Sequence, residues 1–177
     1  MKRRFLTALL ALCTVFALLP AAAVADGGTA LAATQAVLVD GTPYTFYAYA
    51  LYEENVGLTN YVKLRDVAIL LSGTGAQFQV DWKEGAILLT SGEDYTAVGG
   101  ELEEIFVGDQ PYVAGASQVL LDGEPLQLEA ITLVDARGGN HTYFKLRDLG
   151  RALNFNVGWS AQKGVYLESG KPYTDAD

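Results

Sequence analysis

The chain repeats itself at a spacing of 82 residues, and this repeat constrains the fold more than any other feature of the sequence. Residues 35–41 correspond to residues 118–123, and residues 60–66 correspond to residues 142–148. The two spacings agree, since 122 − 40 and 145 − 63 both equal 82. A chain with such ordered matches is built from copies of one structural unit.

The second half of the unit repeats at a shorter spacing. Residues 78–82 (FQVDW) correspond to residues 155–159 (FNVGW), and 159 − 82 is 77. The first copy therefore carries five additional residues, around residues 72–75. We place copy one at residues 35–95, a connecting segment at 96–117 and copy two at 118–173.

Each copy has the local pattern strand, strand, strand, helix, strand, strand. Asp-Gly pairs at Asp40 and Asp122 predict two-residue hairpin turns between the first two strands. After a polar loop come a short strand, a short helix and a last hairpin. In copy one we expect the loop at 53–59, the strand at 61–64, the helix at 65–71 and the hairpin at 78–82 with 86–90; in copy two the loop at 135–141, the helix at 147–153 and the hairpin at 155–159 with 165–168. The predicted fold class is α+β, with two tandem repeats that each pack a small antiparallel sheet around one short helix.

The first 25 residues have the pattern of a secretory signal peptide. A basic cluster at residues 2–4 precedes an apolar run and a small-residue exit, with cleavage expected after Ala25 or alternatively after Ala32. Cys13, the only cysteine, lies inside this segment, so the mature chain has no thiol for a disulfide or a metal. The absence of disulfides favours a bacterial exported protein, secreted or associated with the cell surface.

The mature chain is strongly acidic. It keeps nine basic residues against twenty-one acidic ones, a net charge of 9 − 21 = −12. Nucleic acids and anionic membranes are bound through basic patches, so this charge argues against both partners. No apolar segment after the signal is long enough to cross a membrane.

The repeated motifs resemble a bacterial module called the copper amine oxidase N-terminal domain, or stalk domain. The resemblance rests on the Asp-Gly hairpin, the Tyr-x-Lys-Leu-Arg strand end, the short helix and the Phe-x-Val-x-Trp hairpin. Many members have a proline where this chain has Lys63 and Lys145. The resemblance implies an antiparallel sheet wrapped on one helix, remote from any copper chemistry, and an accessory role on exported proteins. It carries over no copper site, because the chain has one histidine, His141.

The Lys-Leu-Arg-Asp motif occurs in both copies, at residues 63–66 and 145–148, and is interpreted as structural. Asp in the first helical turn interacts with the helix dipole, while Lys and Arg shield strand edges or pair with acids. A repeated charged ligand patch is the alternative. Each tryptophan is interpreted as a core residue that closes a sheet on its helix. The structural set is Lys63, Leu64, Arg65, Asp66, Trp82, Lys145, Leu146, Arg147, Asp148 and Trp159.

Tyr47 and Tyr49 are the candidate ligand-binding residues. Both lie on the strand face opposite Phe46, where copy two has the polar Glu129. An exposed tyrosine strip would suit stacking on a sugar or a partner protein, whereas the alternative is that copy two or the segment after Thr96 covers it.

Nothing in the sequence reads as a catalytic, cofactor or metal site. His141 is interpreted as an exposed loop residue, and the acids Glu101, Glu103 and Glu104 lack the regular spacing of a calcium loop. The sequence therefore predicts a non-enzymatic, stalk-like interaction or spacer module at the bacterial cell surface. One alternative is a carbohydrate- or cell-wall-binding module, with a cell-wall glycan or a surface protein as partner. The other is an unrecognised hydrolase or protease inhibitor.

Overall fold

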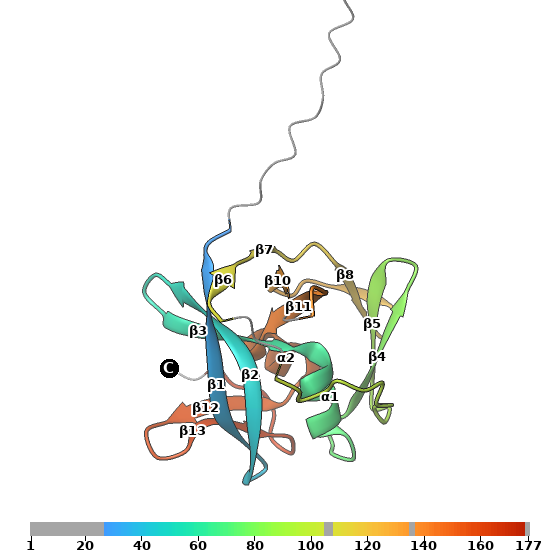
Figure 1. Cartoon of the computed structure of the whole chain (residues 1–177). Coiled ribbons are helices and arrows are strands. Elements are labelled where there is room, and N and C mark those ends of the chain that lie inside the picture. The colour runs from blue at the N-terminus through green and yellow to red at the C-terminus, as the bar shows by residue number, and fades with distance from the viewer. Residues whose placement is uncertain (1–26, 105–107, 135–136, 176–177) are drawn as a thin grey trace, which may run out of the picture.

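The computed structural model describes residues 27–104, 108–134 and 137–175, so the predicted signal peptide lies outside the described residues. Across the described residues the chain forms a mixed α+β fold with thirteen strands and two helices (Figure 1). The elements of the first half are β1 (Thr29–Val39), β2 (Thr42–Glu53), β3 (Gly57–Lys63), α1 (Leu64–Leu71), β4 (Phe78–Lys83) and β5 (Ala86–Ser91). Those of the second half are β6 (Gln110–Pro111), β7 (Val113–Ala114), β8 (Gln118–Leu121), β9 (Glu124–Leu126), β10 (Ala130–Val134), β11 (Asn140–Lys145), α2 (Leu146–Leu153), β12 (Asn156–Ser160) and β13 (Gly164–Glu168).

The local elements follow the sequence pattern closely. Both helices are confirmed and begin one residue earlier than expected, at Leu64 and Leu146. The turn at Asp40 is confirmed as well: Asp40 and Gly41 have φ angles of 49° and 86°, as a type I′ hairpin turn requires. The loop expected at 53–59 is shorter than expected: it is a turn at residues 54–56, because β2 and β3 pair from Glu53 and Gly57 onward.

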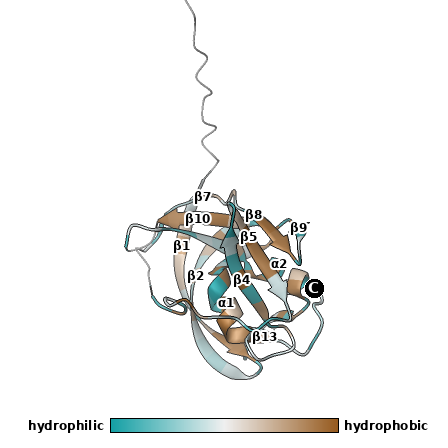
Figure 2. Ribbon diagram, turned by 90° about the vertical axis from the view of Figure 1, so that its right-hand side faces the viewer, coloured by the Kyte–Doolittle hydropathy of each residue, from teal (hydrophilic) through white to brown (hydrophobic). Residues whose placement is uncertain are grey.

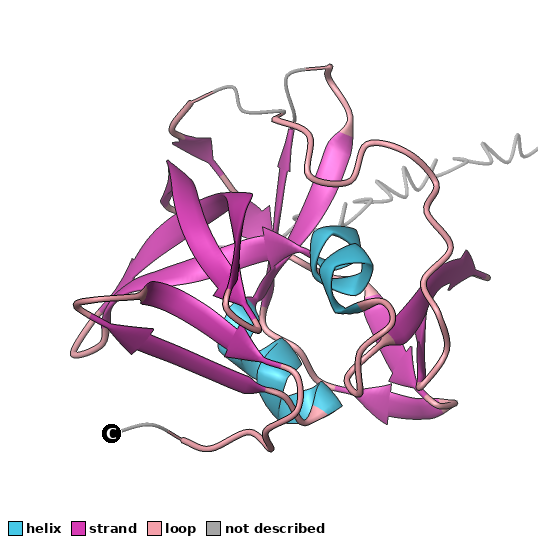
Figure 3. Ribbon diagram, turned by 90° about the horizontal axis from the view of Figure 1, so that it is seen from below, coloured by secondary structure: helices cyan, strands magenta, loops and turns pink. Residues whose placement is uncertain are grey.

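The strands form two sheets. The larger has the order β12-β13-β1-β2-β3-β11-β10-β7, with β6 paired to β1, and the smaller has the order β4-β5-β8-β9. In Figure 1 the β12–β13 hairpin lies against β1 on one side of the molecule, and the β4–β5 hairpin lies beside β8 on the other. The two helices lie between these groups of strands (Figure 3).

The two copies do not each form a sheet of their own. The last strand of copy two, β13, pairs in parallel with β1 of copy one, with Val37 opposite Val165. Reciprocally, β5 of copy one pairs in parallel with β8 of copy two, with Ala86 opposite Gln118. The expectation of one wholly antiparallel sheet per copy is therefore wrong. A separate sheet would leave β1 and β5 as open edges, and this exchange pairs both of them.

The middle strands of the two copies also pair with each other. Strand β3 runs antiparallel to β11, with Val62 opposite Phe144, which is its equivalent at 144 − 62 = 82. Tyr61 then faces Lys145, and Lys63 faces Tyr143. This contact is self-complementary, in the manner of an interface around a twofold axis.

The main core lies between the two sheets and includes the inner faces of both helices. Helix α1 contributes Val67, Ala68 and Leu71, and α2 contributes Leu149, which is fully buried. The α2 helix approaches β12 closely, since a Cβ on Gly150 would lie 2.5 Å from Val157 Cγ2. In the smaller sheet, the inner strand β5 is hydrophobic and the edge strand β4 more hydrophilic (Figure 2).

A second, smaller core is rich in tyrosine and lies on the other side of the large sheet. It contains Tyr49, Tyr61, Tyr143, Ile131 and Leu133 together with Ala30 and Leu51. The rings of Tyr49 and Tyr143 meet edge to face, with centroids 5.1 Å apart.

The connecting segment contributes two short strands to the large sheet. Gln110 and Pro111 of β6 pair with the start of β1, and β7 pairs with β10. The connecting segment therefore forms part of the large sheet; residues 105–107 lie outside the described residues. Within the described part of the chain, neither helix has the length and apolar character needed to cross a membrane.

Candidate functional site: two grooves with exposed tryptophans

Two surface grooves are lined by equivalent residues of the two copies. The Trp82 groove has a volume of about 500 Å³ and lies between the α1 start and β4–β5 of copy one and β11 of copy two. The Trp159 groove, of about 350 Å³, lies between the α2 start and β12–β13 of copy two and β3 of copy one. Each groove thus exists only because the two copies share their central strands.

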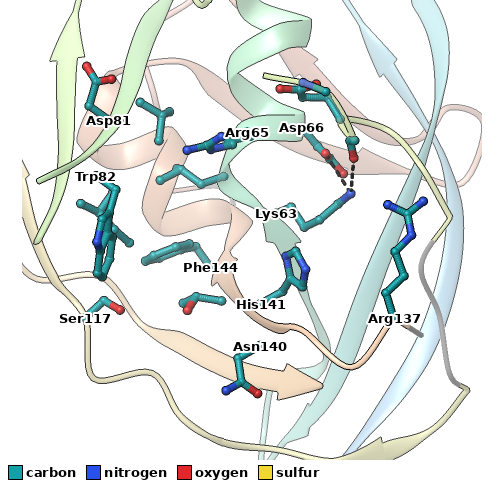
Figure 4. A pocket seen from close by; sticks show the side chains of 17 residues that line it. Lys63, Arg65, Asp66, Asp81, Trp82, Ser117, Arg137, Asn140, His141 and Phe144 are labelled. Atoms are coloured by element: carbon teal, nitrogen blue, oxygen red, sulfur yellow. Dashed lines mark hydrogen bonds and ion pairs between the residues drawn. The ribbon is translucent and has the colours of Figure 1, made fainter. Parts of the chain in front are cut away.

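The two tryptophans are exposed, which corrects the expectation that they close the core. Trp82 is 59% exposed and Trp159 is 64% exposed. Alternation places Trp82 on the same face as Phe78 and Val80, which are both buried. However, Trp82 lies one residue from the end of β4, where its ring forms a wall of the groove (Figure 4).

Tyr47 and Tyr49, which were expected to form an exposed strip, are not both exposed. Tyr49 is only 1% exposed and packs in the tyrosine-rich core, where Gln110 Nε2 donates a hydrogen bond to its hydroxyl at 2.9 Å. Tyr47 is half-buried. The alternative was that copy two and the connecting segment cover this face, and for Tyr49 they do, through Ile131, Leu133 and Gln110.

The Lys63–Asp66 pair holds the connecting segment against the start of α1. Lys63 Nζ lies 3.2 Å from Asp66 Oδ1, and the two side chains are 9% and 2% exposed. Lys63 Nζ also donates to the carbonyl oxygens of Gly100 and Glu103, while the Leu102 amide donates to Asp66 at 3.0 Å. Burial raises the pKa of Asp66 against the opposing effects of these contacts. The structural interpretation of this pair fits its contacts.

In copy two the equivalent lysine contacts acids of both copies. Lys145 Nζ lies 2.9 Å from Glu53 and 3.2 Å from Glu129. The Tyr61 hydroxyl donates to Glu129 at 2.7 Å, and this bond, together with Lys145, lowers the pKa of Glu129. Burial and the neighbouring Glu129 raise the pKa of Tyr61. Asp148 accepts a bond from the Glu129 amide at 3.3 Å, as Asp66 does from Leu102.

The loop at residues 96–104 forms one side of the Trp82 groove and is organised by Glu101. The Tyr95 hydroxyl donates to this carboxylate at 2.6 Å, and the amides of Val98 and Gly99 donate at 2.8 and 2.9 Å. Burial alone would raise the pKa of Glu101, but these hydrogen bonds outweigh it and lower the pKa to about 2.

Arg65 is the cation of the Trp82 groove that the described protein leaves without a counter-ion. Lys63 pairs with Asp66 and Arg137 with Glu103, the latter at 2.6 Å. Arg65 is half-buried, and its guanidinium makes no hydrogen bond or ion pair with the described residues, although its charge acts on the nearby Tyr95 hydroxyl. Figure 4 shows its guanidinium reaching toward the side of the groove where Trp82 lies.

The Trp159 groove repeats this geometry with different chemistry. Its arginine, Arg147, donates a hydrogen bond to the Val157 carbonyl at 3.4 Å. Where the Trp82 groove has Asn140 and His141, the Trp159 groove has Leu58, which is 61% exposed, and Thr59. The two grooves therefore share a scaffold but differ in the side chains at these two positions.

Sequence reasoning missed both grooves as sites, although it named several of their residues. Trp82 and Arg65 were assigned to the structural set, and His141 to an exposed loop. His141 lies within β11, half-buried, and lines the Trp82 groove. One signal was present: each tryptophan stands at the end of a strand that is followed at once by a polar turn, beyond the last core position.

The described residues contain no group of three or more His, Cys, Asp or Glu side chains placed to hold a metal ion. Asp66 and Glu101 do line the Trp82 groove, but the protein already uses both as hydrogen-bond acceptors. The groove thus offers an aromatic ring, the Arg65 guanidinium, neutral polar groups and one exposed carboxylate, Asp81.

Comparisons with known proteins find no match: no family model, no curated protein and no solved structure resembles the chain.

Proposed function

We propose that the chain is an exported, non-catalytic module of the bacterial cell surface that binds a cell-wall or surface ligand through the Trp82 groove. The observation that carries this proposal is the exposure of Trp82, at 59%, on the wall of a groove of about 500 Å³. A large aromatic ring exposed on the wall of a groove gives a ligand a flat surface to stack on. Pockets of this volume accommodate small ligands or the end of a polymer.

The chemistry of the groove supports binding. Asp66 is engaged by Lys63 and by the Leu102 amide, and Glu101 accepts three hydrogen bonds from its own loop. A glycosidase would need two carboxyl groups that face a substrate. The motif resemblance to stalk domains and the predicted signal peptide both support an accessory role outside the cell.

The test is retention of the mature protein, residues 26–177, on purified bacterial cell wall and on insoluble polysaccharides. We expect retention that Trp82→Ala abolishes and Trp159→Ala leaves intact. Both side chains are exposed, so neither variant should change the thermal unfolding midpoint by more than a few degrees. Retention that does not depend on Trp82 would contradict the proposal, and no retention on any wall preparation would favour a spacer.

A further inference from the structure

The Trp82 groove combines an exposed indole with a guanidinium, that of Arg65, for which the described residues supply no acidic partner. The mature chain carries twelve more acidic than basic residues (21 − 9). Among the described residues, Lys63, Arg137, Lys145, Arg151 and Lys171 have acidic partners, whereas Arg65, Lys83, Arg147 and Lys163 have none. Of these four, Arg65 is the one that lines the Trp82 groove. A half-buried guanidinium without an acidic partner can form charge-assisted hydrogen bonds with an external anion.

Trp82 supplies the second recognition element. It lies opposite Ile87 in the β4–β5 ladder, so an apolar side chain is its cross-strand neighbour. A flat, exposed ring of this kind stacks on another flat, partly apolar surface, such as the C–H face of a sugar ring. Asn140, which is exposed, and Ser117 add neutral hydrogen-bonding groups to the lining.

We propose that the Trp82 groove binds an anionic saccharide, with a sugar ring stacked on Trp82 and its carboxylate or phosphate group paired with Arg65. This inference rests on the proposed function and adds the chemical class of the ligand. The groove is large enough for one or two sugar rings at about 500 Å³. In the Trp159 groove the Arg147 guanidinium already donates one hydrogen bond to the Val157 carbonyl, and Leu58 stands where the Trp82 groove has Asn140, so we expect this groove to bind the ligand more weakly.

The test is a calorimetric titration of the mature protein with three soluble probes. These are a trisaccharide of galacturonic acid, a hexosamine phosphate and a neutral trisaccharide of galactose. We expect an anionic probe to bind at least about tenfold more tightly than the neutral one, and its affinity to fall with added salt. The carboxylate and phosphate arms identify which anion Arg65 takes.

Matched variants separate recognition from folding. Arg65→Gln should weaken anionic binding about tenfold and remove the preference over the neutral probe, because it deletes the charge-assisted bonds. Arg147→Gln, in the Trp159 groove, should change neither the affinity for the anionic probe nor its preference over the neutral probe. Trp82→Ala should abolish binding of all probes.

The outcomes distinguish this inference from the proposed function. Equal affinity for anionic and neutral probes, or an anion preference that survives Arg65→Gln, overturns the anionic-saccharide assignment. Failure of all three probes, together with wall retention that depends on Trp82, overturns the saccharide class but leaves the proposed function standing. Wall retention independent of Trp82 overturns the proposed function.

Discussion

Asp40 accepts two hydrogen bonds from Ser169, which lies 129 residues further along the chain. The Ser169 amide donates at 2.8 Å and its hydroxyl at 2.6 Å. The equivalent bonds join Asp122 to Ser91, at 2.9 and 2.6 Å. Each Asp-Gly turn therefore fixes the end of the last strand of the other copy. The hairpin turn and the strand exchange are stabilised by the same carboxylate.

Removal of one such contact should destabilise the whole protein. We expect Ser169→Ala to lower the free energy of unfolding by about 1 kcal/mol, because it deletes the hydroxyl donor to a charged acceptor. Asp40→Asn keeps a residue that tolerates the positive φ of 49° and should give a similar loss. Chemical denaturation of both single variants and of the double variant measures the coupling free energy between Asp40 and Ser169. Additive losses would show that the two residues do not interact.

The exchange of strands predicts that the two halves remain together after cleavage. A protease site placed in the connecting segment near Gly108 would cut the chain between copies without touching either helix. Because β13 pairs with β1 and β5 with β8, we expect the two pieces to co-elute in size-exclusion chromatography and to unfold in one transition. Two separately folded pieces would contradict the shared architecture.

Lys63 and Lys145 occupy equivalent positions but differ in burial. Breaking a buried ion pair leaves an uncompensated charge and costs about 3–5 kcal/mol. Lys63→Met removes the counter-ion of Asp66, which is 2% exposed, and leaves it only the Leu102 amide as a partner, so a loss of this size is expected. Lys145→Met is the matched control and should cost less, since its side chain is 19% exposed and its partners Glu53 and Glu129 are 24% and 56% exposed. Equal losses of unfolding free energy in the two variants would contradict the explanation that the more deeply buried ion pair costs more to break.

The Glu101 loop should loosen in acid. The pKa of Glu101 is about 2 in the folded protein, below its ordinary value of 4.5, so its ionised form stabilises the fold. This stabilisation is fully present above pH 4.5 and is lost as the pH falls toward 2. We expect Glu101→Gln to be less stable than the parent at neutral pH, and the difference to shrink below pH 4.5. A difference between the two melting temperatures that does not change with pH would argue against this role.

The helices and hairpin turns could be predicted from the sequence because each depends on residues that are close together in the chain. The two helices and the Asp-Gly turns were predicted from local sequence patterns and are present in the structure. The exchange of β5 and β13 could not be predicted in this way. A sequence repeat indicates that both copies contain the same strands. It does not indicate whether a strand pairs with a strand of its own copy or with one of the other copy.

The candidate site depended on the same long-range information. Tyr49 is covered by residues about 80 positions further along, such as Ile131, and no local pattern reveals that cover. Trp82 follows the alternation of the buried face and yet lies beyond the core, beside β11 of the other copy. Its exposure follows from where β4 ends relative to that strand, which only the tertiary structure specifies.

The most direct test of the Trp82 groove uses the two tryptophans themselves. The chain has only two, so the indole N–H region of a ¹H–¹⁵N NMR spectrum contains two signals, assigned by Trp82→Phe and Trp159→Phe. On addition of solubilised cell-wall glycan, we expect the Trp82 signal to shift and saturate while the Trp159 signal stays in place. A stationary Trp82 signal, or equal shifts of both signals, would contradict the assignment of the Trp82 groove as the binding site.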